Sequence, residues 1–295
     1  MTFVDPNVRA LVEAAGLEVW RVDEVITRAL EEDLGVEGDV TTNATISPGQ
    51  GATAVLVPRA AGVVAGLPVA AWVFDVVSEG RVQVEFAAAD GAAVRPGDVL
   101  ATVRGPAADI LTAERTALNL LGHLSGVASL TRRWVDAVAG TGAAIRDTRK
   151  TMPGLRALEK YAVRCGGGVN HRLSLSDAAL VKDNHVAAAG SVVRAFELVR
   201  ERYPQLPIEV EVDTVAQARQ AIEAGAQLVL LDNMTPALMR DVVTFASEFP
   251  DVRLEASGGL TLDGARTVAE TGVHYLSVGA LTHSAPVLDI GLDLR

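Results

Sequence analysis

The sequence contains few cysteines, few aromatic residues and no net positive charge. Its single cysteine, Cys165, excludes a disulfide within the chain and is typical of proteins in a reducing compartment. Aromatic residues make up 4% of the chain, and 26 Lys and Arg stand against 37 Asp and Glu, giving a net charge of −11. Because a phosphate backbone needs a broad basic surface, the charge excludes nucleic acid as the main partner.

Long apolar runs are also scarce. Charged residues at Asp5, Arg9 and Glu13 interrupt the N-terminus, where a signal peptide needs an unbroken apolar region. The apolar stretch Ala60–Phe74 is too short for a membrane span and is broken by glycines and Pro68. We therefore expect a cytoplasmic protein without a membrane partner.

The 295 residues are enough for one large or two moderate domains. Up to about residue 110, the pattern predicts a small α/β layer with strands at Ala52–Val57 and Val82–Ala87. Helical spacing of apolar residues at Ile110–Gly122 then predicts a helix over Ala108–Leu130 that leads out of this layer.

From about Ala143 the pattern changes to short apolar runs, each followed by a polar residue or a glycine. The runs end at Asp147, Asp183, Asp213, Asp232, Ser257 and Gly279. Amphipathic helices are predicted between the later runs, at Val192–Arg202, Val215–Ala224, Pro236–Phe249 and Leu262–Thr271. This repetition is typical of parallel βα units and favours a β/α barrel, with an open doubly wound sheet as the alternative.

The polar strand ends have a functional interpretation in a barrel, because active sites lie at the carboxyl ends of its strands. For any single strand, a turn or a helix N-cap explains the polar residue equally well. The recurrence over all of the strands favours a site.

The segment Arg146–His185 is basic within an acidic chain. Between Arg146 and Arg172 only Asp147 and Glu159 oppose a group of basic residues, which are Arg146, Arg149, Lys150, Arg156, Lys160, Arg164 and Arg172. A local excess of positive charge predicts a site for a small, highly charged anion.

The basic residues of this segment divide into two groups. Recurrence at about one-turn spacing assigns Arg156, Lys160 and Arg164 to the solvated face of a helix. The remaining cations adjoin strand ends or a triple glycine and are expected at the barrel mouth; they are Arg149, Lys150, His171, Arg172, Lys182 and His185. Cys165 has no suitably spaced partner for a nucleophile and is interpreted as a packing residue.

The last two strands end in glycine-containing turns, at Ser257-Gly258-Gly259 and at Gly279-Ala280-Leu281. Glycine lets a backbone approach a phosphate closely, although an ordinary tight turn is the alternative. His283 and Ser284 follow and have donors for the same phosphate, while a surface histidine is an equal alternative for His283.

Two carboxylates, Glu211 and Asp232, come from neighbouring predicted strands and are expected to point over the barrel mouth. Their position beside a phosphate site suits Mg²⁺ or the hydroxyls of a ribose. Acid–base catalysis and a structural ion pair are the alternatives.

Taken together, these motifs resemble the quinolinate phosphoribosyltransferases, also called nicotinate-nucleotide pyrophosphorylases (carboxylating). The matching motifs run in order from about residue 33 to 290. They are GDVTT at Gly38–Thr42, ERTALNLLGHLSGVAS at Glu114–Ser129, DTRKTMPGLR at Asp147–Arg156, GGGVNHRLSLSD at Gly166–Asp177, KDNH at Lys182–His185, EVEVD at Glu209–Asp213, LLDNM at Leu230–Met234, SGG at Ser257–Gly259 and the final SVGALTHS.

The resemblance implies an α/β fold of two domains, as in type II phosphoribosyltransferases. An N-terminal α/β sandwich would comprise residues 1–118 and the tail 285–295, and an incomplete β/α barrel residues 119–284. The resemblance also implies a homodimer, which can assemble further, in which the sandwich of one subunit caps the barrel of the other. Arg115 would then reach a substrate carboxylate across the interface. Closed two-fold symmetry makes the two shared sites equivalent.

The reaction implied by the resemblance joins quinolinate to phosphoribosyl pyrophosphate. It gives nicotinate mononucleotide, pyrophosphate and carbon dioxide, and belongs to NAD biosynthesis. The carboxylates of quinolinate would be bound by Arg115, Arg149, His171 and Arg172. Lys150 and Lys182 would serve both quinolinate and pyrophosphate. Glu211 and Asp232 would hold the ribose hydroxyls, the Mg²⁺ cofactor, or both. The 5-phosphate would be bound by Ser257, Gly258, Gly279 and His283.

Two other functions compete with this assignment. A phosphoribosyltransferase that acts on nicotinate needs only one carboxylate clamp, so the surplus of cations disfavours it. A non-catalytic phosphate-metabolite sensor, or a relative diverted to metal-cofactor transport, is expected to have lost a charged residue of the site, and none is lost here.

Overall fold

The computed structural model describes residues 5–295 and divides into two compact units. The first unit comprises the described part of Met1–Arg132, with Thr151–Gly167 and Leu281–Arg295. The second comprises Arg133–Lys150 and Gly168–Ala280. Compact units need not coincide with family domains, so the boundaries expected from the sequence stay a prediction.

The first unit is built on an antiparallel sheet of four strands in the order β12-β1-β5-β3. These strands are β1 (Gly51–Pro58), β3 (Gln83–Phe86), β5 (Ala101–Pro106) and β12 (Ile290–Leu294). A separate pair contains β2 (Gly62–Val63) and β4 (Ala93–Val94). The C-terminal residues therefore complete a sheet that begins near residue 51.

The helices of the first unit pack by burying apolar side chains, except for the short helix Val40–Thr45, whose buried residue is Thr42. They are α1 (Pro6–Ala14), α2 (Val19–Leu34), α3 (Val40–Thr45), α4 (Leu67–Ser78) and α6 (Arg156–Cys165). In α2 the buried residues Val22, Ile26 and Leu30 recur every four positions and form one stripe. Helix α4 is apolar around most of its surface and is correspondingly buried. The boundary between the units falls within α5 (Ala107–Ala137), the helix predicted to lead out of the first layer.

The prediction of a solvated basic face on α6 is wrong for Lys160, and Arg156 is half-buried, with its Nε donating to Oγ1 of Thr151 at 2.9 Å. Lys160 is only 1% exposed, whereas Arg164 is exposed. Helix α6 buries every residue from Leu158 to Val163. The one-turn spacing of its basic residues therefore did not distinguish a solvent-exposed face from a packed one. Burial raises the pKa of Cys165 to about 11, which suits the packing role expected for this thiol.

The second unit contains six parallel strands in the order β6-β11-β10-β9-β8-β7. Their bounds are β6 (Ala144–Arg146), β7 (Ala179–Val181), β8 (Ile208–Val212), β9 (Leu228–Asp232), β10 (Arg253–Ser257) and β11 (Tyr275–Ser277). This is the cyclic order of a barrel, and within residues 5–295 no ladder joins β6 to β7. The predicted fold, a β/α barrel left incomplete, is confirmed over an open doubly wound sheet.

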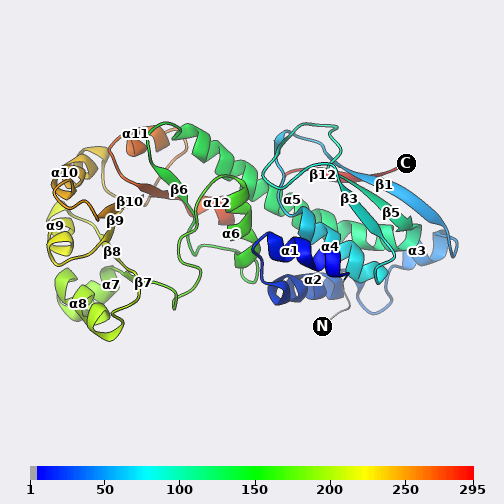
Figure 1. Ribbon diagram of the computed structural model, residues 1–295, viewed down its shortest axis with the longest axis horizontal. Coiled ribbons are helices and arrows are strands. Elements are labelled where there is room, and N and C mark those ends of the chain that lie inside the picture. Colours follow the sequence, from blue (N-terminus) through cyan, green and yellow to red (C-terminus); the bar gives the residue numbers. More distant parts are fainter. Residues whose placement is uncertain (1–4) are drawn as a thin grey trace. The chain divides into compact units, whose positions relative to one another are not determined.

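Helices follow the strands as the sequence predicted, and several pack against the sheet (Figure 1). They are α7 (Asp183–Ala189), α8 (Val192–Arg202), α9 (Val215–Glu223), α10 (Pro236–Ala246), α11 (Ala265–Ala269) and, across the unit boundary, α12 (Ala280–His283). Local capping fixes where they begin: Thr214 and Gln217 form a capping box on α9, and Thr235 caps α10 ahead of Pro236. No helix within residues 5–295 is long and apolar enough to cross a membrane.

Candidate active site

A pocket of about 590 Å³ opens where the strands of the second unit end. Its lining combines cations, carboxylates and glycines from segments far apart in the sequence. The lining residues are Thr148, Arg149, Lys150, His171, Arg172, Leu180, Lys182, Glu211, Leu230, Asp232, Asn233, Glu255, Ser257, Gly258, Gly259 and Ser277. The parallel strands bring them together because all six carboxyl ends meet at one edge of the sheet.

Two arginines in the pocket have donors without acceptors. The Nε atoms of Arg149 and Arg172 are both buried, and no hydrogen-bond partner for either lies among residues 5–295. Arg172 is held by its Nη1, which donates to the carbonyl oxygen of Ala178 at 2.8 Å. Burial lowers the pKa of Arg172, and the neighbouring charge of Arg149 lowers it further. Two close guanidinium groups with unmatched donors form a site for an anion.

A buried carboxylate, Asp147, ties together the two loops that bear these arginines. Asp147 is fully buried just after β6, two residues before Arg149. Its Oδ1 accepts the backbone N–H of His171 at 2.8 Å, and its Oδ2 accepts from Nδ2 of Asn170. The loop that carries Arg149 and the loop that carries Arg172 are therefore fixed to each other from below.

The carboxylates predicted from the strand ends lie on neighbouring strands of the pocket wall. Lys182 Nζ is 2.7 Å from Oε2 of Glu211, so the charge of Glu211 is partly neutralised. The other carboxylate, Asp232, accepts from Nδ2 of Asn233 at 2.7 Å. Both carboxylates are half-buried at the pocket edge, where a hard cation or sugar hydroxyls can reach them.

The glycine turn after β10 has a backbone that only glycine adopts easily. Gly258 and Gly259 have φ values of +84° and +60°. A Cβ at Gly258 would stand 2.3 Å from Oδ1 of Asn233, whose own N–H donates to the carbonyl of Ser257 at 2.9 Å. The β10 turn and the β9 turn are therefore packed against each other, leaving a backbone-lined wall for a phosphate.

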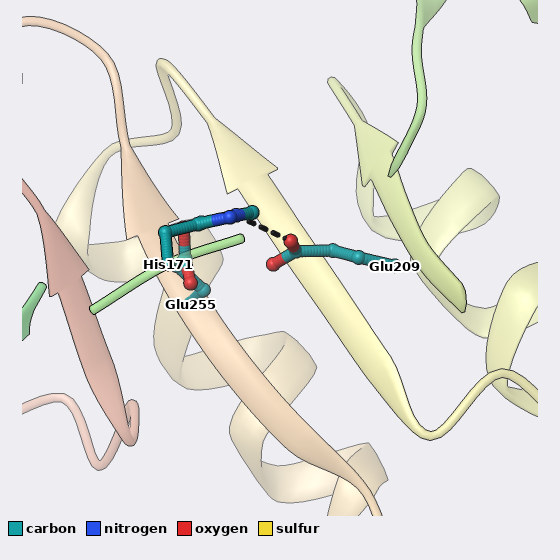
Figure 2. Close-up of side chains that lie close together, drawn as sticks. All are labelled: His171, Glu209 and Glu255. Carbon is teal, nitrogen blue, oxygen red and sulfur yellow. Dashed lines mark ion pairs between the residues drawn. The ribbon is translucent and has the colours of Figure 1, made fainter. Parts of the chain in front are cut away.

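The side chain of His171 lies close to two buried glutamates, Glu209 and Glu255 (Figure 2). We call Arg146, His171, Glu209 and Glu255 the floor cluster. Arg146 Nη1 is 2.6 Å from Oε2 of Glu255 and 3.9 Å from Oε1 of Glu209. The Nε2 atom of His171 is 2.6 Å from Oε2 of Glu209 and 3.8 Å from Oε1 of Glu255. The hydroxyl of Ser277 donates to Oε1 of Glu255.

The floor cluster shifts the acidities of its glutamates. Burial, with the nearby charge of Glu209, raises the pKa of Glu255 to about 7, against the opposing effects of Arg146 and His171. Burial also raises the pKa of Glu209. Neither oxygen of Glu209 has an aligned hydrogen-bond donor among residues 5–295, although His171 lies within ion-pair distance.

Most of the residues proposed from the sequence line this one pocket. They are Arg149, Lys150, His171, Arg172, Lys182, Glu211, Asp232, Ser257 and Gly258. Gly279 is in the second unit but is not among the lining residues, and Arg115 and His283 belong to the first unit. The roles of those three residues stay predictions.

One residue expected at the mouth lies elsewhere. The Nδ1 of His185 accepts the backbone N–H of Lys182 at 2.9 Å, and its ring lines a separate apolar cavity beside β7. As the third residue of α7, it turns back to the start of its own helix, so the mouth does not contain it.

The sequence interpretation missed part of the lining, namely Thr148, Leu180, Leu230, Asn233, Glu255 and Ser277. No local signal marked Glu255 or Glu209, because each shares its strand with another charge, Arg253 on β10 and Glu211 on β8. Side chains alternate across a strand, so such a charge must face either the helices or the barrel interior.

Two family models match the chain in succession. The N-terminal domain of quinolinate phosphoribosyl transferase matches residues 39–125, and its C-terminal domain matches residues 127–293.

Whole-chain relatives agree with these matches. The nicotinate-nucleotide pyrophosphorylase (carboxylating) of Mycobacterium leprae is 54% identical, over 92% of this chain and 96% of that protein. The probable nicotinate-nucleotide pyrophosphorylase (carboxylating) of Bacillus subtilis is 43% identical, over 89% of this chain and 90% of that protein. A solved structure of nicotinate-nucleotide pyrophosphorylase from Francisella tularensis has a TM-score of 0.90 at 33% identity, covering 95% of this chain and 98% of that one. The chain therefore belongs to the quinolinate phosphoribosyl transferase family.

Proposed function

We propose that the chain transfers the phosphoribosyl group of phosphoribosyl pyrophosphate to quinolinate with loss of carbon dioxide, giving nicotinate mononucleotide and pyrophosphate for NAD biosynthesis. The observation that carries this proposal is the pair of buried, unmatched Nε donors on Arg149 and Arg172. A dicarboxylate supplies acceptors to both guanidinium groups at once, and its charge relieves the repulsion between them.

The chain's own residues account for binding and orientation. Arg149 and Arg172 hold the carboxylates so that the pyridine nitrogen faces the sugar carbon. Lys150 and Lys182 neutralise the pyrophosphate as it leaves. The Ser257–Gly259 turn, with Gly279 and His283, binds the 5-phosphate through backbone and side-chain donors.

Mg²⁺ fits the donor set of this pocket. Glu211 and Asp232 provide oxygen atoms on adjacent strand ends, and Mg²⁺ in proteins is typically bound by one or two carboxylates together with substrate phosphates. The ion, when bound, supplies positive charge to the phosphate oxygens. The two carboxylates also accept from the ribose hydroxyls and favour the positive charge that develops at the sugar carbon.

Decarboxylation follows from the charge on the product of transfer. Once its nitrogen carries the sugar, the ring is a pyridinium and accepts the electron pair left by the departing carboxyl group, and a proton then replaces that group. The residues required of the protein are those that fix the carboxylates, and no covalent enzyme intermediate is needed.

The proposal includes a cytoplasmic homodimer with shared sites. Arg115 is exposed on α5 in the first unit, and we assign it to a substrate carboxylate in the partner subunit's pocket. Mixing inactive Arg115→Ala and Lys150→Ala chains should restore part of the activity, because one site of each mixed dimer then has both residues. Absence of any rescue in a verified mixed dimer would contradict shared sites.

The substrate is tested by supplying Mg²⁺ and phosphoribosyl pyrophosphate with either quinolinate or nicotinate and measuring carbon dioxide and mononucleotide. We expect product from quinolinate alone. Turnover of nicotinate without turnover of quinolinate would refute the proposal.

The two-arginine clamp is tested with Arg172→Ala, which should lower kcat/KM for quinolinate by about 100-fold, since it removes a charged, oriented contact. The matched control is Arg240→Ala, which removes an exposed arginine of α10 and should leave kcat/KM within about twofold.

A further inference from the structure

The floor cluster adjoins the two-arginine clamp, and its members His171 and Glu255 also line the pocket. Glu255 is fully buried on β10, and three groups surround its carboxylate: Arg146, the hydroxyl of Ser277 and the ring of His171. These contacts come from β6, from β11 and from the loop before β7, so one carboxylate joins three segments of the second unit.

His171 connects this carboxylate layer to the clamp. Its backbone N–H donates to Asp147, and its Nδ1 accepts the backbone N–H of Arg172 at 2.7 Å. An Nδ1 that accepts a hydrogen bond bears no proton, so the ring proton resides on Nε2, beside Glu209 and Glu255. Both ring nitrogens therefore have partners within the chain, and the imidazole supports Arg172 from below.

Such a cluster could instead bind a metal ion, since ligand atoms of His171, Glu209 and Glu255 lie within 4.8 Å of one another. Arg146 argues against that use. Its guanidinium is already in ion-pair contact with both glutamates, so a divalent ion would have to bind against a neighbouring positive charge.

We infer that Glu255 is a positioning residue for the dicarboxylate clamp: it pairs with Arg146 and, at 3.8 Å from Nε2 of His171, acts with the nearer Glu209 at 2.6 Å to seat the imidazole. The imidazole in turn fixes the main chain of Arg172. The kinetic test of this inference rests on the proposed function. Its NMR test rests only on the geometry of the floor cluster. Loss of the carboxylate leaves Arg146 without its closest partner and lets His171 turn, which shifts the Arg172 guanidinium. A displacement of about 1 Å in a binding group costs on the order of 100-fold.

The experiment uses Glu255→Gln in the full-length chain, with Glu248→Gln, an exposed residue next to α10, as the matched control. We expect the KM for quinolinate to rise by about 10- to 100-fold in Glu255→Gln. The KM for phosphoribosyl pyrophosphate should stay within about twofold, and the control should match the wild type in both constants. Equal rises in both KM values would mean general structural damage and would overturn the inference.

A second measurement separates this inference from the proposed function. Nitrogen-15 NMR of the histidine rings reports the tautomer of His171 without any substrate, and we expect the Nε2-protonated form in the wild type and a tautomer mixture in Glu255→Gln. An unchanged His171 signal in the folded variant would overturn positioning even if quinolinate were the wrong substrate.

Ser277→Ala removes only one hydrogen bond to the Glu255 carboxylate and should raise the quinolinate KM by a smaller factor than Glu255→Gln. An unchanged KM in both variants would also refute the inference.

Discussion

The side chains of β8 and β10 form two layers, two residues apart along each strand, and the two layers have opposite environments. Glu211 and Glu209 lie two positions apart on β8, and Ser257 and Glu255 do so on β10, so each pair points to one face. The upper layer, with Lys182 and Asp232, lines the open pocket and is half-buried. In the lower layer the two glutamates are buried and paired with Arg146 and His171.

Both layers lie on one face of the strands, so position along the strand separates the residues that bind from the residues that support them. Charges of the upper layer are half-buried at the pocket edge, whereas the two glutamates of the lower layer are buried, even though Glu255 adjoins the pocket, and burial raises their pKa values. Barrel interiors are usually filled by apolar side chains, so a charged layer here is retained at a cost in desolvation. If the upper layer binds ligands and the lower layer supports it, the two should respond differently to substitution and to pH.

The largest expected effect comes from removing the cation of the lower layer. Arg146→Met should lower the free energy of unfolding by about 3–5 kcal/mol, because two buried glutamates then lack their cation. Urea denaturation followed by circular dichroism measures this loss. The control is Arg253→Met, an exposed arginine at the start of β10, for which we expect less than about 1 kcal/mol. Equal losses would mean that burial does not distinguish the two arginines.

Substitution in the upper layer should lower the activity rather than the stability. Glu211→Gln keeps the shape but removes the charge, and we expect kcat to fall by about 100- to 1000-fold. The free energy of unfolding should change by less than about 1 kcal/mol, because Glu211 is a half-buried partner of Lys182. Steady-state rates and urea denaturation test both parts, with the exposed Glu201→Gln as control. A stability loss comparable to that of Arg146→Met would remove the contrast between the layers.

The pH dependence of stability should originate from the lower layer. Since the pKa of Glu255 is raised from 4.5 to about 7, the folded state binds a proton that the unfolded state releases. Its contribution to stability is therefore present below about pH 4.5 and is lost as the pH rises to about 7, with a slope of at most about 1.4 kcal/mol per pH unit. Urea denaturation between these pH values should show a flatter dependence in Glu255→Gln than in the wild type. Parallel curves would contradict the raised pKa.

The smallest effect is expected in the glycine turn. Gly258→Ala places a Cβ 2.3 Å from Asn233 Oδ1 at a φ of +84°, so we expect a loss of about 1–3 kcal/mol and a higher KM for phosphoribosyl pyrophosphate. Gly259→Ala is its matched partner, since φ is also positive but the nearest atom is 3.9 Å away. It should cost about 1 kcal/mol or less. A greater loss at Gly259 would reverse the ranking of the two glycines.

The upper layer could be read from the sequence and the lower layer could not. Polar residues that end apolar runs, such as Lys182, Asp232 and Ser257, predicted the pocket because parallel strands end at one edge. Glu209 and Glu255 sit inside strands, and no local pattern says whether such a charge faces a partner or solvent.

Other parts of the structure depend on contacts between distant segments. Periodicity placed α8 over its observed span, but it also assigned Lys160 to a wet face, because spacing along α6 does not reveal how many of its sides are packed. His185 was expected in the mouth from its motif, whereas a local hydrogen bond at the start of α7 turns it away.

The buried Asp147 determines how the two arginine-bearing loops move. Because one buried carboxylate accepts from both Asn170 and the His171 backbone, opening of either arginine-bearing loop would break hydrogen bonds to a buried charge, which couples the two loops. Their backbone amides should therefore exchange hydrogen as one cooperative unit. A dicarboxylate that reaches the pocket then meets either a complete clamp or none, so discrimination begins at the first encounter rather than in a later tightening.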